Sequence, residues 1–169
     1  MAIAERLVDA FERVRDAVHP AIQGLSAEQL AVRLDPEANT IAWLVWHLTR
    51  IQDDHVADAA GAEQVWTAEG WIGRFGLPFA PEATGYGHGP DDVEAVRVTA
   101  DLLAGYYDAT HRHTIDYVRG LPDADFDRVV DDSWEPPVTL GVRLVSVIAD
   151  DLEHVGQAAF VRGIVERSR

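Results

Sequence analysis

Four long stretches of this 169-residue sequence repeat apolar residues every three or four positions, the spacing of amphipathic helices. They predict helices over about 3–24, from Asn39 or Thr40 to about 60, from just after Asp91 to about 120, and from Thr139 to about 166. No alternating strand pattern lies between them. With 47% hydrophobic residues, the chain can bury a sizeable core. We therefore expect an all-α fold, a four-helix bundle that forms a single domain over residues 1–169.

Residues that start or stop helices support these limits. Asn39 or Thr40 can cap the second helix and Thr139 the fourth, whereas Gly120 offers a stop for the third. Pro20 should weaken the last turn of the first helix, because proline lacks an amide hydrogen. The segment 61–90 is rich in glycine, proline and aromatic residues. It predicts a long, ordered crossover between helices two and three, with one short helix, that could cover a pocket.

The composition excludes several classes of function. A formal net charge of −15 argues against binding nucleic acids or anionic membranes, since both need clustered cations. The chain has no cysteine, which removes disulfides and thiolate ligands, and it has no lysine, which removes Schiff-base chemistry. Any bound metal must therefore use nitrogen or oxygen ligands. The N-terminus carries charges where a secretion signal is apolar, and no apolar run approaches membrane-spanning length, so we expect a cytoplasmic protein.

An acid and a histidine, Asp150 and His154, lie one turn apart in the fourth predicted helix. Both should point to the interior, because their expected neighbours on that helix face are apolar: Val147, Ala158, Val161 and Val165. His47, on the apolar face of the second helix, can lie opposite the pair. Two imidazoles and one carboxylate would hold a divalent ion such as zinc, nickel or iron. The alternative is a core polar network in which these side chains pair with one another and bind no metal.

Several other polar residues have weaker claims to a functional role. Ser146, Asp150 and His154 follow one another at four-residue spacing, but Ser146 and His154 would lie about 12 Å apart on a straight helix, too far for a hydrolytic triad. We expect the following residues at the rim or the surface: Asp53, Asp54, His55, His88, His111 and His113. His88, in the glycine-rich part of the crossover, could instead approach a site.

Two sequence motifs resemble those of the DinB-like superfamily. Trp43-Leu-Val-Trp-His47-Leu is similar to the family's helix-two histidine followed by leucine, and Asp150-Asp-Leu-Glu-His154-Val-Gly-Gln157 is similar to its late His-x-x-x-His-x-Gly-Gln pattern. These proteins are metal-binding four-helix bundles that include bacillithiol and mycothiol S-transferases and mycothiol-dependent maleylpyruvate isomerase. The resemblance implies that His47 and His154 bind a metal, and that Asp150 stands where the family usually has a third histidine.

The resemblance also implies a function and further site residues. It indicates a small-molecule S-transferase or isomerase that uses a low-molecular-weight thiol of the mycothiol type; the alternative is a noncatalytic metal-binding, stress-associated or assembly protein. Arg50 would meet the thiol at the mouth of the site, and Gln157 would support a ligand or contact substrate. Asp151 could replace Asp150 only if the helix turned by about 100°. Family members of this kind lead us to expect a homodimer.

Overall fold

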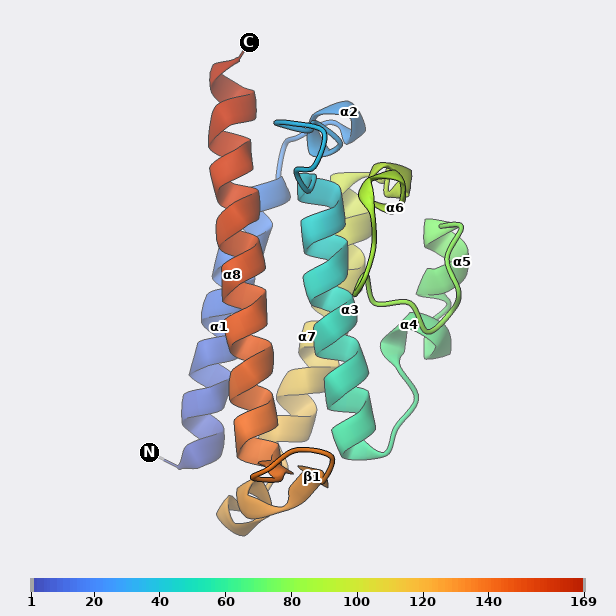
Figure 1. Ribbon diagram of the computed structural model, residues 1–169. Coiled ribbons are helices and arrows are strands. Elements are labelled where there is room, and N and C mark those ends of the chain that lie inside the picture. Colours follow the sequence, from blue (N-terminus) through green and yellow to red (C-terminus); the bar gives the residue numbers. More distant parts are fainter. Residues whose placement is uncertain (1, 169) are drawn as a thin grey trace.

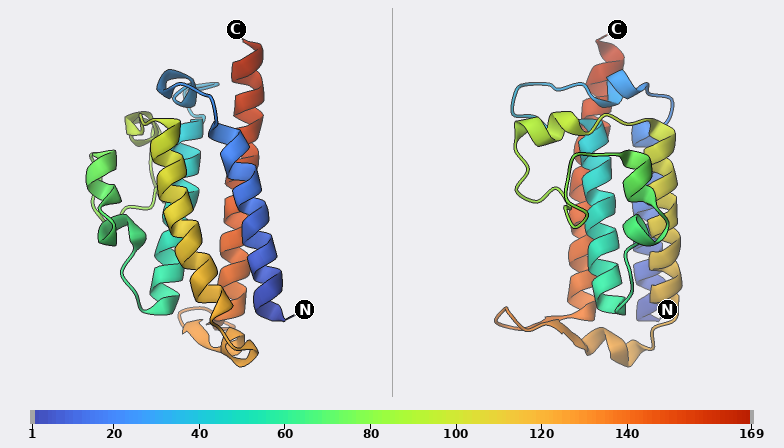
Figure 2. Two further views of the ribbon diagram at one scale, coloured as in Figure 1. Left: turned by 180° about the vertical axis from the view of Figure 1, so that it is seen from behind. Right: turned by 90° about the vertical axis from the view of Figure 1, so that its right-hand side faces the viewer.

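A computed structural model describes residues 2–168 and contains four long helices packed as a bundle, as predicted (Figure 1). They are α1 (Ile3–Ile22), α3 (Ile41–Ala60), α7 (Ala100–Arg119) and α8 (Leu140–Arg167). In Figures 1 and 2, α1 and α8 run in one direction along the bundle and α3 and α7 in the other. Both α3 and α1 pack against α7 and α8, so α1 and α3 lie diagonally opposite. This order places α3 and α8 side by side and antiparallel.

Threonine side chains begin three of these helices. The hydroxyls of Thr40, Thr99 and Thr139 each accept a hydrogen bond from the amide three residues further on, at 3.1, 3.3 and 3.5 Å. The predicted starts of α3 and α8 are thus confirmed. The predicted third helix is wrong at its start, because Pro90–Ala95 forms a separate short helix, α6, and α7 begins only after Thr99.

The long crossover between α3 and α7 is also confirmed, although it holds more structure than expected. It contains α4 (Val65–Ala68) and α5 (Trp71–Phe75) where one short helix was predicted, followed by α6. Figure 2 shows this segment lying on the outside of α3 and α7. Its aromatic residues Trp66, Trp71 and Phe75 are buried and fix it to the bundle.

Short elements that the sequence did not predict complete the chain. A one-turn helix, α2 (Ala27–Leu30), follows α1, which ends at Ile22 rather than residue 24. Between α7 and α8 lie a 3₁₀ helix, η1 (Asp123–Asp127), and two strands, β1 (Val129–Asp131) and β2 (Val138–Thr139), which pair antiparallel. Among the described residues, no helix is both long and apolar enough to cross a membrane.

Candidate metal centre

His47 of α3 faces Asp150 and His154 of α8 across the groove between the two helices. One donor atom from each residue lies within 4.8 Å of the other two. His154 Nε2 is 3.5 Å from Asp150 Oδ1, and the two imidazole rings are 4.8 Å apart, centroid to centroid, at an angle of 69°. The structure therefore brings together the three side chains that the sequence proposed as ligands.

The sequence predicted that Asp150 and His154 point to the interior of the bundle, and this is wrong: both lie on the flank of α8 and not on its core face. The core face carries Val147, Asp151, Val155 and Ala158, all buried. Asp150 and His154 keep 33% and 19% of their side-chain surface exposed. A shift of one residue turns a helix by about 100°, so Asp151 points into the bundle while Asp150 points at α3. The half-buried position leaves the centre reachable from solvent.

Each imidazole has one nitrogen held by an oxygen acceptor. His47 Nδ1 donates to the carbonyl of Thr84 in the crossover, and His154 Nδ1 donates to Gln157 Oε1, 3.3 Å away. Because a neutral imidazole carries one proton, this leaves Nε2 of His47 with a free lone pair, whereas Nε2 of His154 faces the Asp150 carboxylate, where a proton and a metal ion compete for it. Metal-binding histidines use this same arrangement, with the second nitrogen bonded to an oxygen.

The residues present fit a divalent ion. Asp150 Oδ2 is buried and has no hydrogen-bond partner, which is costly for a carboxylate unless something else binds it. Nitrogen and oxygen ligands sit about 2.0–2.2 Å from zinc, so two donors at a tetrahedral angle on one ion lie about 3.3–3.6 Å apart. The three donor atoms, which lie within 4.8 Å of one another, therefore need to approach by up to about 1.5 Å to bind one ion. Three protein ligands leave a coordination position for a substrate.

The two histidines have opposite pKa shifts. Burial lowers the pKa of His47, and the nearby His154 lowers it further, so the ring stays neutral and able to bind metal. The hydrogen bond to Asp150 raises the pKa of His154 in the metal-free protein. Protons therefore compete with metal mainly at His154.

The crossover reaches the centre through a glycine that the sequence analysis did not single out. Gly85 has φ +100°, and a Cβ there would lie 2.6 Å from His47 Nδ1 and 3.1 Å from Trp43. Only glycine permits both this backbone conformation and this approach. Trp43 stacks on His47 at 4.6 Å, centroid to centroid, and donates from Nε1 to His88. The Gly85-Tyr-Gly-His-Gly sequence was the available signal for such a close approach.

The remaining candidates lie elsewhere. Arg50 is fully buried, so it does not stand at the mouth where the sequence placed it, and Asp151 is fully buried in the core. Asp53 and His111 were expected at the rim or surface and are in fact buried. The ring of Tyr107 stacks on His111 and covers it, whereas the next residues in the chain, Arg112 and His113, are exposed.

Ser146 is exposed and bonds the carbonyl of Val142, so it takes no part in the centre. Asp54 and His55 are half-buried, and His113 is exposed, as expected. His88 is not a solvated loop residue: it stacks on Trp46 and packs against Phe79.

A largely apolar groove of about 410 Å³ adjoins the centre between the N-terminal end of α3 and α8. Leu44, Phe160 and Val161 provide apolar walls, and Asn39 and Gln157 add amide groups. Gln157 belongs to both the groove and the centre, since it holds His154.

The family model described as mycothiol-S-transferase matches residues 6–166. A solved structure described as the conserved protein of locus from Enterococcus faecalis is similar, with 27% sequence identity, a TM-score of 0.90 and 99% of each chain covered. No curated protein matches this chain. The family match includes all the residues of the centre.

Proposed function

Because the chain belongs to the mycothiol-S-transferase family and has its DinB-like fold, we propose that it is a metal-dependent S-transferase. It would join a low-molecular-weight thiol of the mycothiol type to an electrophilic small molecule. The observation that carries the proposal is the group His47, Asp150 and His154, in which an oxygen holds Nδ1 of each imidazole and one carboxylate oxygen has no partner.

In this proposal, His47 Nε2, His154 Nε2 and an oxygen of Asp150 hold one divalent ion, zinc, nickel or iron. Aspartate stands in place of the family's third histidine and adds a negative charge to the ligand set. A bound divalent ion lowers the pKa of a coordinated thiol, so that the thiolate predominates near neutral pH. The chain has no cysteine of its own, which fits a nucleophile that arrives with the cosubstrate.

The protein residues would orient the reactants. Thr84 and Gln157 fix the two imidazoles, and Trp43 covers one face of His47 against water. The groove bounded by Leu44, Phe160 and Val161 shares Gln157 with the centre and offers apolar surface to one of the two reactants. Thiolate sulfur would attack an electrophilic carbon held there and displace its leaving group.

A thiol-transfer assay tests the proposal. Protein loaded with zinc, nickel or iron is mixed with mycothiol and an alkyl halide, and the S-conjugate is measured together with the released halide. We expect metal-dependent turnover that His47→Ala and His154→Ala reduce to the background rate, while the exposed His113→Ala leaves it unchanged. Conjugation at the background rate with every metal would overturn the transferase assignment.

A further inference from the structure

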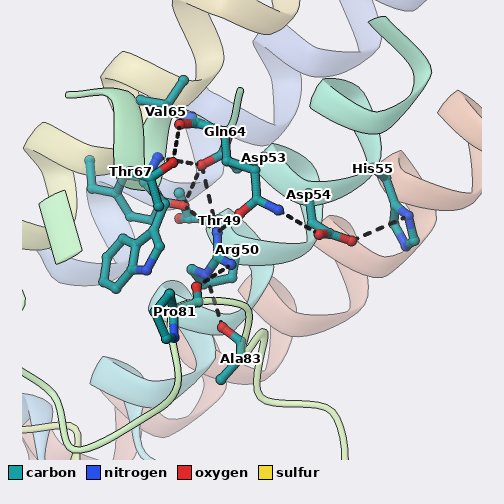
Figure 3. A network of polar contacts seen from close by, with 12 residues as sticks. Thr49, Arg50, Asp53, Asp54, His55, Gln64, Val65, Thr67, Pro81 and Ala83 are labelled. Atoms are coloured by element: carbon teal, nitrogen blue, oxygen red, sulfur yellow. Dashed lines mark hydrogen bonds and ion pairs between the residues drawn. The ribbon is translucent and has the colours of Figure 1, made fainter. Parts of the chain in front are cut away.

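Arg50 is a buried cation that joins the bundle to the crossover. Its side chain is fully buried on α3, one turn after His47. Nε donates to the carbonyl of Ala83 at 3.0 Å, and Nη2 lies 3.5 Å from the carbonyl of Pro81. Figure 3 shows these two carbonyls on one side of the guanidinium and Asp53 and Gln64 on the other. One side chain thus holds both ends of the segment 64–83.

The far side of the guanidinium is equally well bonded. Nη1 donates to Gln64 Oε1 at 2.8 Å and to the Tyr106 hydroxyl at 3.2 Å, and it lies 3.7 Å from Asp53 Oδ2. Asp53 in turn accepts hydrogen bonds from the backbone amides of Val65 and Trp66, both at 2.8 Å. The charge of Arg50 is therefore compensated inside the protein and is not available to a substrate.

The carbonyls that accept hydrogen bonds from Arg50 belong to residues just before those that contact His47. Thr84, which accepts from His47 Nδ1, follows Ala83 in the chain, and Gly85 packs on His47 and Trp43. Since His47 and Arg50 are three residues apart on α3, they present donors along one face to successive carbonyls of the same loop. The position of the Thr84 carbonyl thus depends on the contacts that fix residues 81 and 83.

We propose that Arg50 is a positioning residue for His47. By binding the carbonyls of Pro81 and Ala83, it holds the Thr84 carbonyl where it fixes the His47 ring as the Nδ1-protonated tautomer, with Nε2 free. The inference rests on the proposed function for its purpose, because a fixed Nε2 lone pair matters only where His47 binds a metal.

Arginine suits this task better than lysine. The guanidinium presents donors in a planar fork that reach opposite sides at once, whereas an ammonium is a single compact charge. Arg50→Lys keeps the positive charge near Asp53, but one ammonium cannot donate to the carbonyls of residues 81 and 83 and to the Gln64 side chain at the same time. Gln64→Met is the matched control, because it removes a partner of the same guanidinium on the side away from the loop.

The test measures the ¹⁵N chemical shifts of the His47 ring in metal-free protein, at a pH where the ring is neutral, together with zinc affinity. Wild type and Gln64→Met should show one tautomer, protonated at Nδ1. Arg50→Lys should show a mixture of tautomers and a zinc affinity lower by about 10- to 100-fold, the usual effect of losing a group that orients a ligand. Val14→Ala, which opens space in the core at α1, controls for lost stability.

A single Nδ1-protonated tautomer and unchanged zinc affinity in Arg50→Lys would overturn the proposal, as would an equal loss of affinity in Val14→Ala. Arg50→Gln, whose amide can reach at most one of the two carbonyls, should also show the mixture, so it keeps the test usable if Arg50→Lys fails to fold. A single tautomer in Arg50→Gln would then count against the proposal. Failure of wild type to bind zinc would contradict the proposed function, whereas the tautomer in the metal-free protein still decides the role of Arg50.

Discussion

At the scale of single residues, the candidate centre depends on which nitrogen of each histidine is occupied. The Thr84 carbonyl and Gln157 Oε1 occupy Nδ1 of His47 and His154, so Nε2 is the nitrogen of each ring that can bind an ion. Asp150 Oδ1 lies 3.5 Å from Nε2 of His154, whereas on His47 Asp150 has only a smaller electrostatic effect. Two chemically identical side chains thereby acquire different affinities for protons.

The metal-free protein should show this difference in a titration followed by NMR. We expect His47 to titrate below the ordinary pKa of 6.5 and His154 above it. The stabilisation from protonated His154 is present below pH 6.5 and is lost as the pH rises through its folded pKa. For His47 the sign is opposite: stability is lost as the pH falls from 6.5 through its lowered folded pKa.

Two variants separate the causes of these shifts. Asp150→Asn should lower the pKa of His154, because the hydrogen bond to Asp150 is its largest cause. Glu153→Gln, which removes a smaller contribution, should lower it much less. A His47 ring that becomes protonated at a higher pH than His154 would contradict the geometry of the centre.

The sequence could identify the three candidate ligands because they are side chains at helical spacing. Asp150 and His154 stand four apart, and His47 lies on an apolar stripe. It could not reveal the Thr84 carbonyl, since a backbone group has no sequence signature. Nor could periodicity decide between Asp150 and Asp151, because two adjacent acids differ only by the rotation of the helix, and packing fixes that rotation.

At the scale of elements, helix starts were predictable where a threonine cap coincided with the start of the apolar pattern, as at α3 and α8. The break before α7 was missed because the apolar spacing runs through it, from Val93 and Val96 to Leu103. Here the Thr99 cap and the extended backbone after α6 override the periodicity. Strands β1 and β2 are only three and two residues long, too short for an alternating pattern to be visible.

At the scale of the whole molecule, α8 contributes to more than the bundle and the metal centre. Its outer face carries a row of exposed apolar side chains at helical spacing: Val142, Val145, Leu152 and Phe160. The exposed small residues Ala149 and Gly156 continue the same row and would let another helix approach closely. We propose that a second copy of the chain covers this face in a homodimer. The organisation of residues 1–169 as a single domain stays a prediction.

Sedimentation equilibrium tests the dimer. We expect wild type to form dimers that tighten with added salt, because each copy has a net charge of −15 and salt screens their repulsion. Leu152→Glu should shift the protein to monomers, whereas Trp134→Glu, which replaces an exposed aromatic residue in the loop between β1 and β2, should not. Wild type that remains monomeric at high protein concentration and high salt would rule the dimer out.

The central claim is that His47, Asp150 and His154 together hold one divalent ion, and elemental analysis tests it most directly. Protein purified without chelator or affinity metal should contain about one zinc, nickel or iron per chain, as one set of three protein ligands per chain predicts. His47→Ala, Asp150→Ala and His154→Ala should each lose it, whereas Asp151→Asn, at the adjacent buried acid, should keep it. Wild type that contains no metal and binds none on addition would contradict the claim, and the three side chains would then be a polar network of the groove.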